Sequence, residues 1–209
     1  MNAAVKVKLF GKLLPQQVKL GEITRLLGPV EGKVCLDIGH DNGAISRILR
    51  KRGGTWSTVV RDEGSRLAVE DAIGDKVQAF DGLNMPFNDK TFDVVIVSDL
   101  LERVPDDHAL ITECHRVLKP TGRLILDVPH AKRWSVLSLL EAAFGPAAAK
   151  KERARAGYTE TELFQLLKHG FDVLTVRSYS RALVEIVDML VGLKEQRIED
   201  GGAQLDRLS

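Results

Sequence analysis

The stretch that most constrains the fold is residues 34–43, where an apolar run ends at Asp37 and two glycines follow, Gly39 and Gly43. Apolar side chains then recur at helical spacing over residues 44–52. This pattern predicts a strand, a tight turn and the start of a helix in quick succession. In an open parallel sheet, ligands bind beyond the carboxyl ends of the strands, where the strand order reverses. We therefore expect a ligand-binding crevice at the end of this first strand, which we place at residues 33–37.

Length and charge limit the classes of protein to which the chain can belong. Its 209 residues suit one domain, 1–209, and its hydrophobic and charged contents of 44% and 28% are ordinary for a globular protein. The formal net charge of +1 gives no field that would gather nucleic acid, so no nucleic-acid partner is expected. The dense basic run at residues 150–155 is interpreted as a solvated segment.

The cysteines and the apolar segments indicate in which cellular compartment the protein is expected. Cys35 lies in the first apolar run and Cys114 on an amphipathic segment, so both are expected in the core, and neither a disulfide framework nor a metal site is predicted. Residues 1–10 have no apolar signal core, and no stretch reaches the roughly 18 apolar residues of a membrane span. We expect a cytoplasmic protein, for which peripheral contact with a membrane stays open.

Expected strands and helices alternate along the first part of the chain. A helix over residues 15–27 precedes the first strand, and the helix over residues 44–52 follows it. Further strands are expected at residues 56–61, 76–80, 92–98 and 123–128, further helices from residue 62 and over residues 107–118, and a turn at residues 119–122. Such alternation with short connections predicts an α/β fold, a Rossmann-like three-layer sandwich around a mostly parallel sheet.

The last part of the chain has a looser pattern. Thr159 and Glu162 have the spacing of a capping box, which predicts the start of a helix that ends at Gly170. The other elements expected there are an apolar helix, a loop, a strand and a final helix, over residues 134–144, 145–157, 171–179 and 181–193.

With these elements in place, the chain resembles the class I S-adenosylmethionine (SAM)-dependent methyltransferases, and more narrowly their bacterial small-molecule type. The resemblance is carried by four blocks in order: Leu-Asp-Ile-Gly at 36–39 with Gly43, Asp-Gly-Leu-Asn-Met-Pro-Phe at 81–87, Phe-Asp-Val-Val at 92–95 through Pro-Asp at 105–106, and Arg-Val-Leu-Lys-Pro-Thr-Gly at 116–122. It implies six or seven strands in the order 3-2-1-4-5-(7)-6. It also implies an N-terminal helical cap at residues 1–30 and a substrate-side insertion at residues 132–158.

The resemblance also implies where SAM would bind. The glycine turn after the first strand would pass under the methionine part, and the acid that ends the second strand would hold the ribose hydroxyls. Asp81 would meet the adenine, and residues 98–100 would line the floor beside the methyl group. The candidate cofactor-binding residues are Asp37, Gly39, His40, Gly43, Asp62, Asp81, Gly82, Ser98, Asp99 and Leu100.

Two positions depart from the family pattern. Asp41 stands where the family commonly has glycine, and Val60 stands where the spacing places the ribose acid. Asp62 lies two residues further on and is our candidate for the ribose-binding acid, with Glu63 second. The acid at Asp41 would repel a pyrophosphate, and the middle glycine of G-x-G-x-x-G is missing, which argues against a dinucleotide-binding protein.

Methyl transfer from a sulfonium needs positioning and a dry pocket more than it needs a catalytic triad. His130, directly after Pro129 at the end of the fifth strand, is the candidate general base, and a turn histidine without a catalytic role is the alternative. Arg133, Trp134 and Tyr158 are the candidate substrate residues, with core packing as the alternative for Trp134 and Tyr158.

The sequence therefore favours a SAM-dependent methyltransferase that acts on a small-molecule or lipid-like acceptor. A non-catalytic relative that serves as a binding or regulatory subunit is the alternative, motivated by Asp41 and Val60. The acceptor site is expected between residues 15–27 and 132–158, neither of which carries a motif that identifies the acceptor. Monomer and homodimer both stay open.

Overall fold

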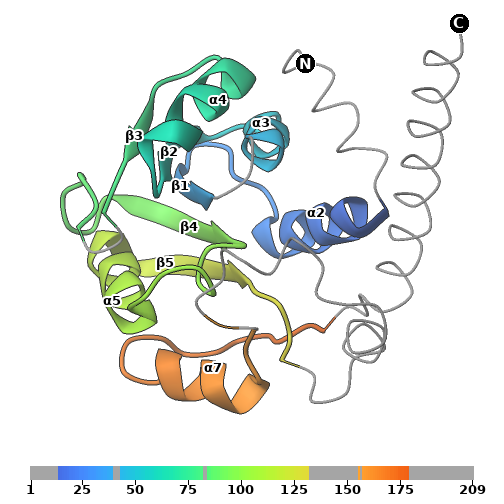
Figure 1. Cartoon of the computed structure of the whole chain (residues 1–209), viewed down its shortest axis with the longest axis vertical. Helices are drawn as coiled ribbons and strands as arrows, with labels where there is room; N and C mark the ends of the chain where they lie inside the picture. Colours follow the sequence, from blue (N-terminus) through green and yellow to red (C-terminus); the bar gives the residue numbers. More distant parts are fainter. Residues whose placement is uncertain (1–13, 40–42, 82–83, 132–154, 156, 179–209) are drawn as a thin grey trace, which may run out of the picture.

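The computed structural model of the chain describes residues 14–39, 43–81, 84–131, 155 and 157–178. In this part, five parallel strands form one sheet in the predicted order β3-β2-β1-β4-β5 (Figure 1). The strands are β1 (Val34–Gly39), β2 (Thr55–Val60), β3 (Val77–Ala79), β4 (Phe92–Ser98) and β5 (Leu118–Asp127). The strand order reverses between β1 and β4, which is where an open sheet of this kind binds ligands.

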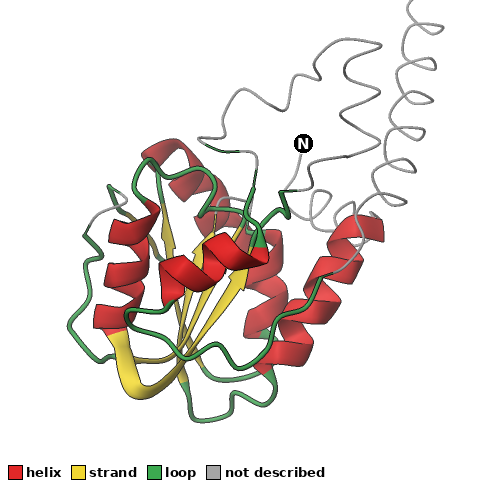
Figure 2. Ribbon diagram, turned by 90° about the horizontal axis from the view of Figure 1, so that it is seen from below, coloured by secondary structure: helices red, strands yellow, loops and turns green. Residues whose placement is uncertain are grey.

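Helices cover both faces of the sheet, as the sequence predicts (Figure 2). One face carries α2 (Leu14–Leu27), α3 (Ala44–Arg50) and α4 (Glu63–Ile73). The other face carries α5 (Asp107–Val117) and α7 (Glu160–Leu167), and the predicted capping box of Thr159 and Glu162 begins α7. The result is a three-layer sandwich whose layers are helices, sheet and helices.

The side chains of β4 show how the two halves of the core are built. Val95 and Val97 pack with α5, while Val94 and Ile96 pack with α2 and α3. All four are fully buried. Because successive side chains of a strand face opposite sides, an apolar run is what a central parallel strand requires.

The prediction of a turn at residues 119–122 is wrong, because these residues lie within β5. Leu118 pairs with Phe92, and pairing with β4 resumes with Arg123 opposite Val94, after a shift in register. Asp93 accounts for part of this arrangement. Its carboxylate accepts hydrogen bonds from the Val34 N–H and from Lys119 Nζ, each at 2.9 Å, and these bonds hold the pKa of Asp93 below its usual range.

The predicted strand at residues 171–179 is also corrected. Residues 171–178 have no regular secondary structure, and Leu174 and Val176 are exposed. Alternation of apolar side chains suggests a strand, but a strand forms only where its backbone groups find a partner. No strand in the described part of the chain pairs with this segment.

Both cysteines are free and buried, as predicted. Burial raises the pKa of the Cys35 thiol to about 11 and also raises that of Cys114. Both thiols therefore behave as small apolar core residues. Among the described residues, no helix is both long enough and apolar enough to span a membrane.

Tyr158 ties the segment before α7 to the loop that follows β4. Its ring is 1% exposed, and its hydroxyl lies 3.1 Å from the carbonyl oxygen of Leu101 and 2.9 Å from Asp107 Oδ2. The Arg155 guanidinium stacks 4.5 Å from the ring centroid and also pairs with Asp107. Tyr158 is thus a core anchor, which is the packing alternative that the sequence leaves open.

We expect Tyr158→Phe to lower the free energy of unfolding by about 1–2 kcal/mol, because it removes the buried hydroxyl that donates to the Leu101 carbonyl oxygen. Urea unfolding measures the change. Phe164→Ala, in which a ring that is 56% exposed is removed from α7, serves as the control and should change stability by much less. Equal effects of the two substitutions would contradict an anchoring role for the Tyr158 hydroxyl.

Candidate functional site

The residues that follow the parallel strands share one edge of the sheet, and β1 brings Asp37 and Gly39 to it. Asp37 is 1% exposed and accepts a hydrogen bond from Ser46 Oγ in the first turn of α3. Gly43, just before α3, has a left-handed φ of 79°. A Cβ at this position would lie 2.9 Å from the Cβ of Ala72 in α4, so only glycine allows this close approach.

Three polar residues lie next to one another at the ends of β4 and β5. Ser98 is opposite Gly39 on one side and Asp127 on the other. Its hydroxyl is buried and has no hydrogen-bond partner in the part of the chain that the structure describes. Asp99 has a φ of 51°, and non-glycine residues in this conformation cluster at functional sites. These features point to a ligand at the junction of β1 and β4.

Helix α2 adds a lysine to this edge that the sequence does not single out. Lys19 is 4% exposed and forms ion pairs with Asp99 and with Asp127, whose Oδ2 lies 2.8 Å from Nζ. Lysine is almost never buried to this extent unless it is paired. One lysine on an amphipathic helix carries no sequence signal, because its pairing depends on how α2 lies on the sheet.

The end of β2 offers no acid in the expected position. Val60 is 1% exposed and packs with Val69 and Val77 beneath α4. Asp62 lies beyond the end of β2 and is the N-cap of α4, where its two oxygens accept from the backbone N–H and the hydroxyl of Ser65, each at 2.8 Å. Its carboxylate is therefore used for helix capping, and its role at a ribose stays a prediction.

Arg61 crosses the edge of the sheet beside this position. Its guanidinium donates a hydrogen bond to the carbonyl oxygen of Arg103, in the loop after β4. Arg61 directly follows β2, so this bond links the end of β2 to the loop after β4. Arg103 in turn donates from Nε to the carbonyl oxygen of Asp99 at 3.0 Å. A cationic side chain thus lies at the end of β2, where the sequence places a ribose-binding acid.

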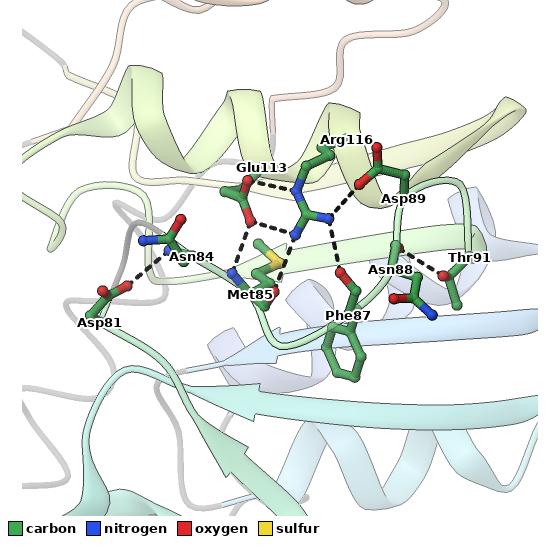
Figure 3. Close-up of polar contacts among 9 residues, drawn as sticks. All are labelled: Asp81, Asn84, Met85, Phe87, Asn88, Asp89, Thr91, Glu113 and Arg116. Carbon is green, nitrogen blue, oxygen red and sulfur yellow. Dashed lines mark hydrogen bonds and ion pairs between the residues drawn. The ribbon is translucent and has the colours of Figure 1, made fainter.

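The loop after β3 carries Asp81, whose Oδ1 accepts from the Asn84 N–H at 2.8 Å (Figure 3). Arg116 of α5 holds this loop by donating to the carbonyl oxygens of Phe87 at 2.8 Å and Met85 at 3.1 Å. Glu113, on the same helix, accepts from the Met85 N–H at 2.8 Å. Two side chains of α5 therefore fix the path of the loop that presents Asp81.

The ion pairs that hold this loop favour the charged forms of Arg116 and Glu113. Arg116 forms ion pairs with Glu113 at 2.8 Å and with Asp89 at 2.7 Å. Hydrogen bonds from Arg116 and from the Met85 N–H lower the pKa of Glu113 despite its burial, and the two carboxylates raise the pKa of Arg116. Arg116 belongs to a sequence block that resembles the family, but the sequence of that block does not show that Arg116 binds the loop after β3.

The remaining predicted site residues divide into two groups. His130 is exposed, and its backbone pairs with that of Tyr158 next to the end of β5, whereas the side chain of Leu100 is fully buried in the core. The other group lies outside the described residues: His40, Gly82, Arg133 and Trp134, together with Asp41 and most of the predicted insertion at residues 132–158. The roles assigned to both groups stay predictions.

Comparison with known proteins gives the sheet and its edge a family context. A family model described as a methyltransferase domain matches residues 36–126, which run from β1 to β5. This match covers less than half of the chain, and over that part the chain is similar to a methyltransferase domain. The matched part of the chain includes Asp37, Asp81, Ser98 and Asp99, and leaves Lys19 and His130 outside.

Two curated relatives are similar to the chain over its central part. A probable tocopherol O-methyltransferase of Oryza sativa is 35% identical over 102 residues, which are 45% of this chain and 28% of that protein. A ubiquinone/menaquinone biosynthesis C-methyltransferase of a Ruegeria species is 33% identical over 109 residues, 48% of this chain and 44% of that protein. The chain thus spans less than half the length of either relative.

A solved structure has the same fold at low sequence identity. It is geranyl diphosphate C-methyltransferase from Streptomyces coelicolor, in complex with Mg²⁺, geranyl-S-thiolodiphosphate and S-adenosyl-L-homocysteine. The TM-score is 0.57 at 17% identity, and the match covers 74% of this chain and 57% of that chain.

We expect Arg116→Met to lower the free energy of unfolding by about 2–3 kcal/mol, because it leaves Glu113 without its charged partner. Hydrogen exchange over residues 84–91 should rise as well, because the loop loses its tether. Arg66→Met is the matched control, since Arg66 pairs with Glu63 and Glu70 on the surface of α4, and exposed pairs contribute little. Unchanged exchange in the loop would show that Arg116 does not hold it.

The lowered pKa of Glu113 predicts a specific dependence of stability on pH. An unfolded glutamate has a pKa of about 4.3, so the Glu113 contribution is complete above that pH and is lost as the pH falls through the lower folded pKa. Between pH 7 and pH 3, urea unfolding of Glu113→Gln should therefore show about 1–2 kcal/mol less acid-dependent loss than the wild type. Parallel stability curves for the two proteins would contradict this.

Proposed function

We propose that this chain transfers a methyl group from SAM to a small-molecule acceptor. The observation that carries the proposal is the row of polar residues along one edge of the sheet, at the ends of β1, β3 and β4, within the segment that matches a methyltransferase domain. Asp37, Asp81, Ser98 and Asp99 form this row. Its place at the strand-order reversal is the expected ligand position in an open parallel sheet.

The residues at this edge fit SAM in two respects. The buried Ser98 hydroxyl can accept or donate a hydrogen bond to a ligand at the junction of β1 and β4. Asp99 and Asp127 make that end acidic, with Lys19 as the paired cation, and an acidic site attracts a ligand that carries a sulfonium and an ammonium group. On the nucleoside side, Asp81 is the acid available for the adenine amino group.

When bound, SAM supplies a methyl group on a positively charged sulfur, and the protein supplies position and a dry pocket. Asp37 and the turn before α3 would hold the methionine part, and residues 98–100 would form the floor beside the reacting methyl. His130, exposed after β5, would take a proton from an acceptor hydroxyl. The acceptor enters from the side of β4 and β5.

The acceptor that we propose is small and largely apolar. The support is that the names of the curated relatives describe methylation of tocopherol and of ubiquinone or menaquinone precursors, and the structural neighbour acts on geranyl diphosphate. The basic run at residues 150–155 is weak support for an anionic acceptor, because its described member Arg155 is engaged with Asp107 and Tyr158. We place the protein in the cytoplasm, which the two free buried cysteines support.

Asp81→Asn should weaken binding of both SAM and S-adenosylhomocysteine by about tenfold or more, because a hydrogen bond to a charged group is lost. Isothermal titration calorimetry measures binding of both ligands, and Asp75→Asn is the control, since Asp75 is 57% exposed and directly follows the C-cap of α4. If the wild type binds neither ligand at millimolar concentration, the proposed function is wrong. If the wild type binds and the Asp81 variant binds equally tightly, the adenine role of Asp81 is wrong.

Transfer itself is tested with SAM labelled on the methyl group, offered together with small metabolites, RNA or cell protein. Label in the small-molecule fraction is the expected result. Label confined to RNA or protein would overturn the proposed acceptor class.

The second candidate function is a non-catalytic subunit that keeps the fold, and one observation favours it. Val60 is buried beneath α4, Asp62 is occupied as a helix cap, and Arg61 donates to the loop after β4, so the end of β2 carries a cation where a ribose-binding acid is expected. Binding of SAM without transfer to any of the three acceptor pools would favour this reading.

A further inference from the structure

Lys19 links the N-terminal helix to the tips of two neighbouring strands. Its ammonium is 4% exposed and pairs with Asp99, directly after β4, and with Asp127, the last residue of β5. The backbone reinforces this junction, because the Asp99 N–H lies 3.2 Å from the Asp127 carbonyl oxygen. A single cation thus holds two acids that come from different strands.

The opposite end of α2 is held in a different way. Arg123, near the middle of β5, donates to the carbonyl oxygens of Leu26 and Leu27 at 3.3 and 2.8 Å. Ile23 and Leu27 pack in the core against the sheet. The C-terminal half of α2 is therefore anchored by apolar contacts and by Arg123, whereas Lys19 anchors the half that lies beside the candidate pocket.

Burial of Lys19 and Asp127 is costly as a means of stability alone, whereas Asp99 is part-exposed, at 31%. The desolvation penalty of a buried ion pair can exceed its Coulomb energy, and apolar residues of similar size often stabilise a protein as well. Asp99, one member of this cluster, has a left-handed backbone and directly follows Ser98, whose hydroxyl is buried, at the reversal of the strand order. Its position therefore points to a role in the pocket.

We propose that Lys19 is a positioning residue that fixes the Asp99 and Asp127 carboxylates and sets how strongly the pocket prefers SAM over its demethylated product. This inference rests on the proposed function. Methyl transfer converts a positively charged sulfur into a neutral thioether, so the charge of the pocket acts differently on the reactant and the product. Lys19 offsets one of the two negative charges of Asp99 and Asp127. The offset weakens the attraction for SAM, and the remaining negative charge still favours SAM over its neutral-sulfur product.

The test compares the dissociation constants of SAM and S-adenosylhomocysteine, measured by calorimetry, in four proteins. We expect Lys19→Met to increase the preference for SAM about fivefold, because one positive charge near the sulfonium is removed. Asp127→Asn removes a negative charge and should reduce the preference by a similar factor. Arg25→Met is the matched control on an exposed position of the same helix, and it should leave the ratio unchanged.

Hydrogen exchange of the α2 amides, without any ligand, provides an independent measurement. Exchange in the N-terminal half of α2 should rise in Lys19→Met and stay at the wild-type level in Lys19→Arg and Arg25→Met. An unchanged ligand ratio in both Lys19→Met and Asp127→Asn would overturn the proposal. If Lys19→Met does not fold, Asp127→Asn decides the ratio. Absence of binding to the wild type would overturn the proposed function, while the exchange data would still judge whether Lys19 positions α2.

Discussion

Pairing of β1 between β2 and β4 is the constraint on which the rest of the structure depends. It places the end of β1 at the reversal of the strand order and directs the exits of all the paired strands to one edge. Because backbone hydrogen bonds of a parallel sheet fix the register, Gly39 must lie opposite Ser98, and Ser98 opposite Asp127. The polar edge is a direct consequence of that register, although its residues are far apart in the chain.

Charged side chains then connect this edge to the helices on both faces. On one face, Lys19 brings α2 to the ends of β4 and β5. On the other, Arg116 and Glu113 of α5 hold the loop that carries Asp81. Each contact joins segments that are distant in sequence, so the site is shaped by how helices dock on the sheet as much as by the strands themselves.

The end of β2 has no acid at the position where the sequence places a ribose-binding acid. A buried valine, a capping aspartate and an arginine that reaches the loop after β4 are found there. Charged side chains are therefore unevenly distributed at the carboxyl ends of the strands, with acids after β4 and at the end of β5 and an arginine after β2. An uneven charge distribution of this kind would orient a ligand whose own charges are concentrated at the sulfur and the amino acid end.

The sequence by itself determined the alternation of strands and helices, the sheet order, the Thr159 capping box and the burial of both cysteines. These features follow from local periodicity, end signals and a family resemblance, all of which are written in neighbouring residues. Only the tertiary structure decided that residues 119–122 lie within β5, that residues 171–178 have no strand partner, and that Asp62 caps α4. It also decided the pairing of Lys19 with Asp99 and Asp127 and the hydrogen bond of Arg116 to the loop after β3. The physical reason is that strand pairing and ion pairing require a partner brought close by packing, and no local pattern specifies which distant residue that partner will be.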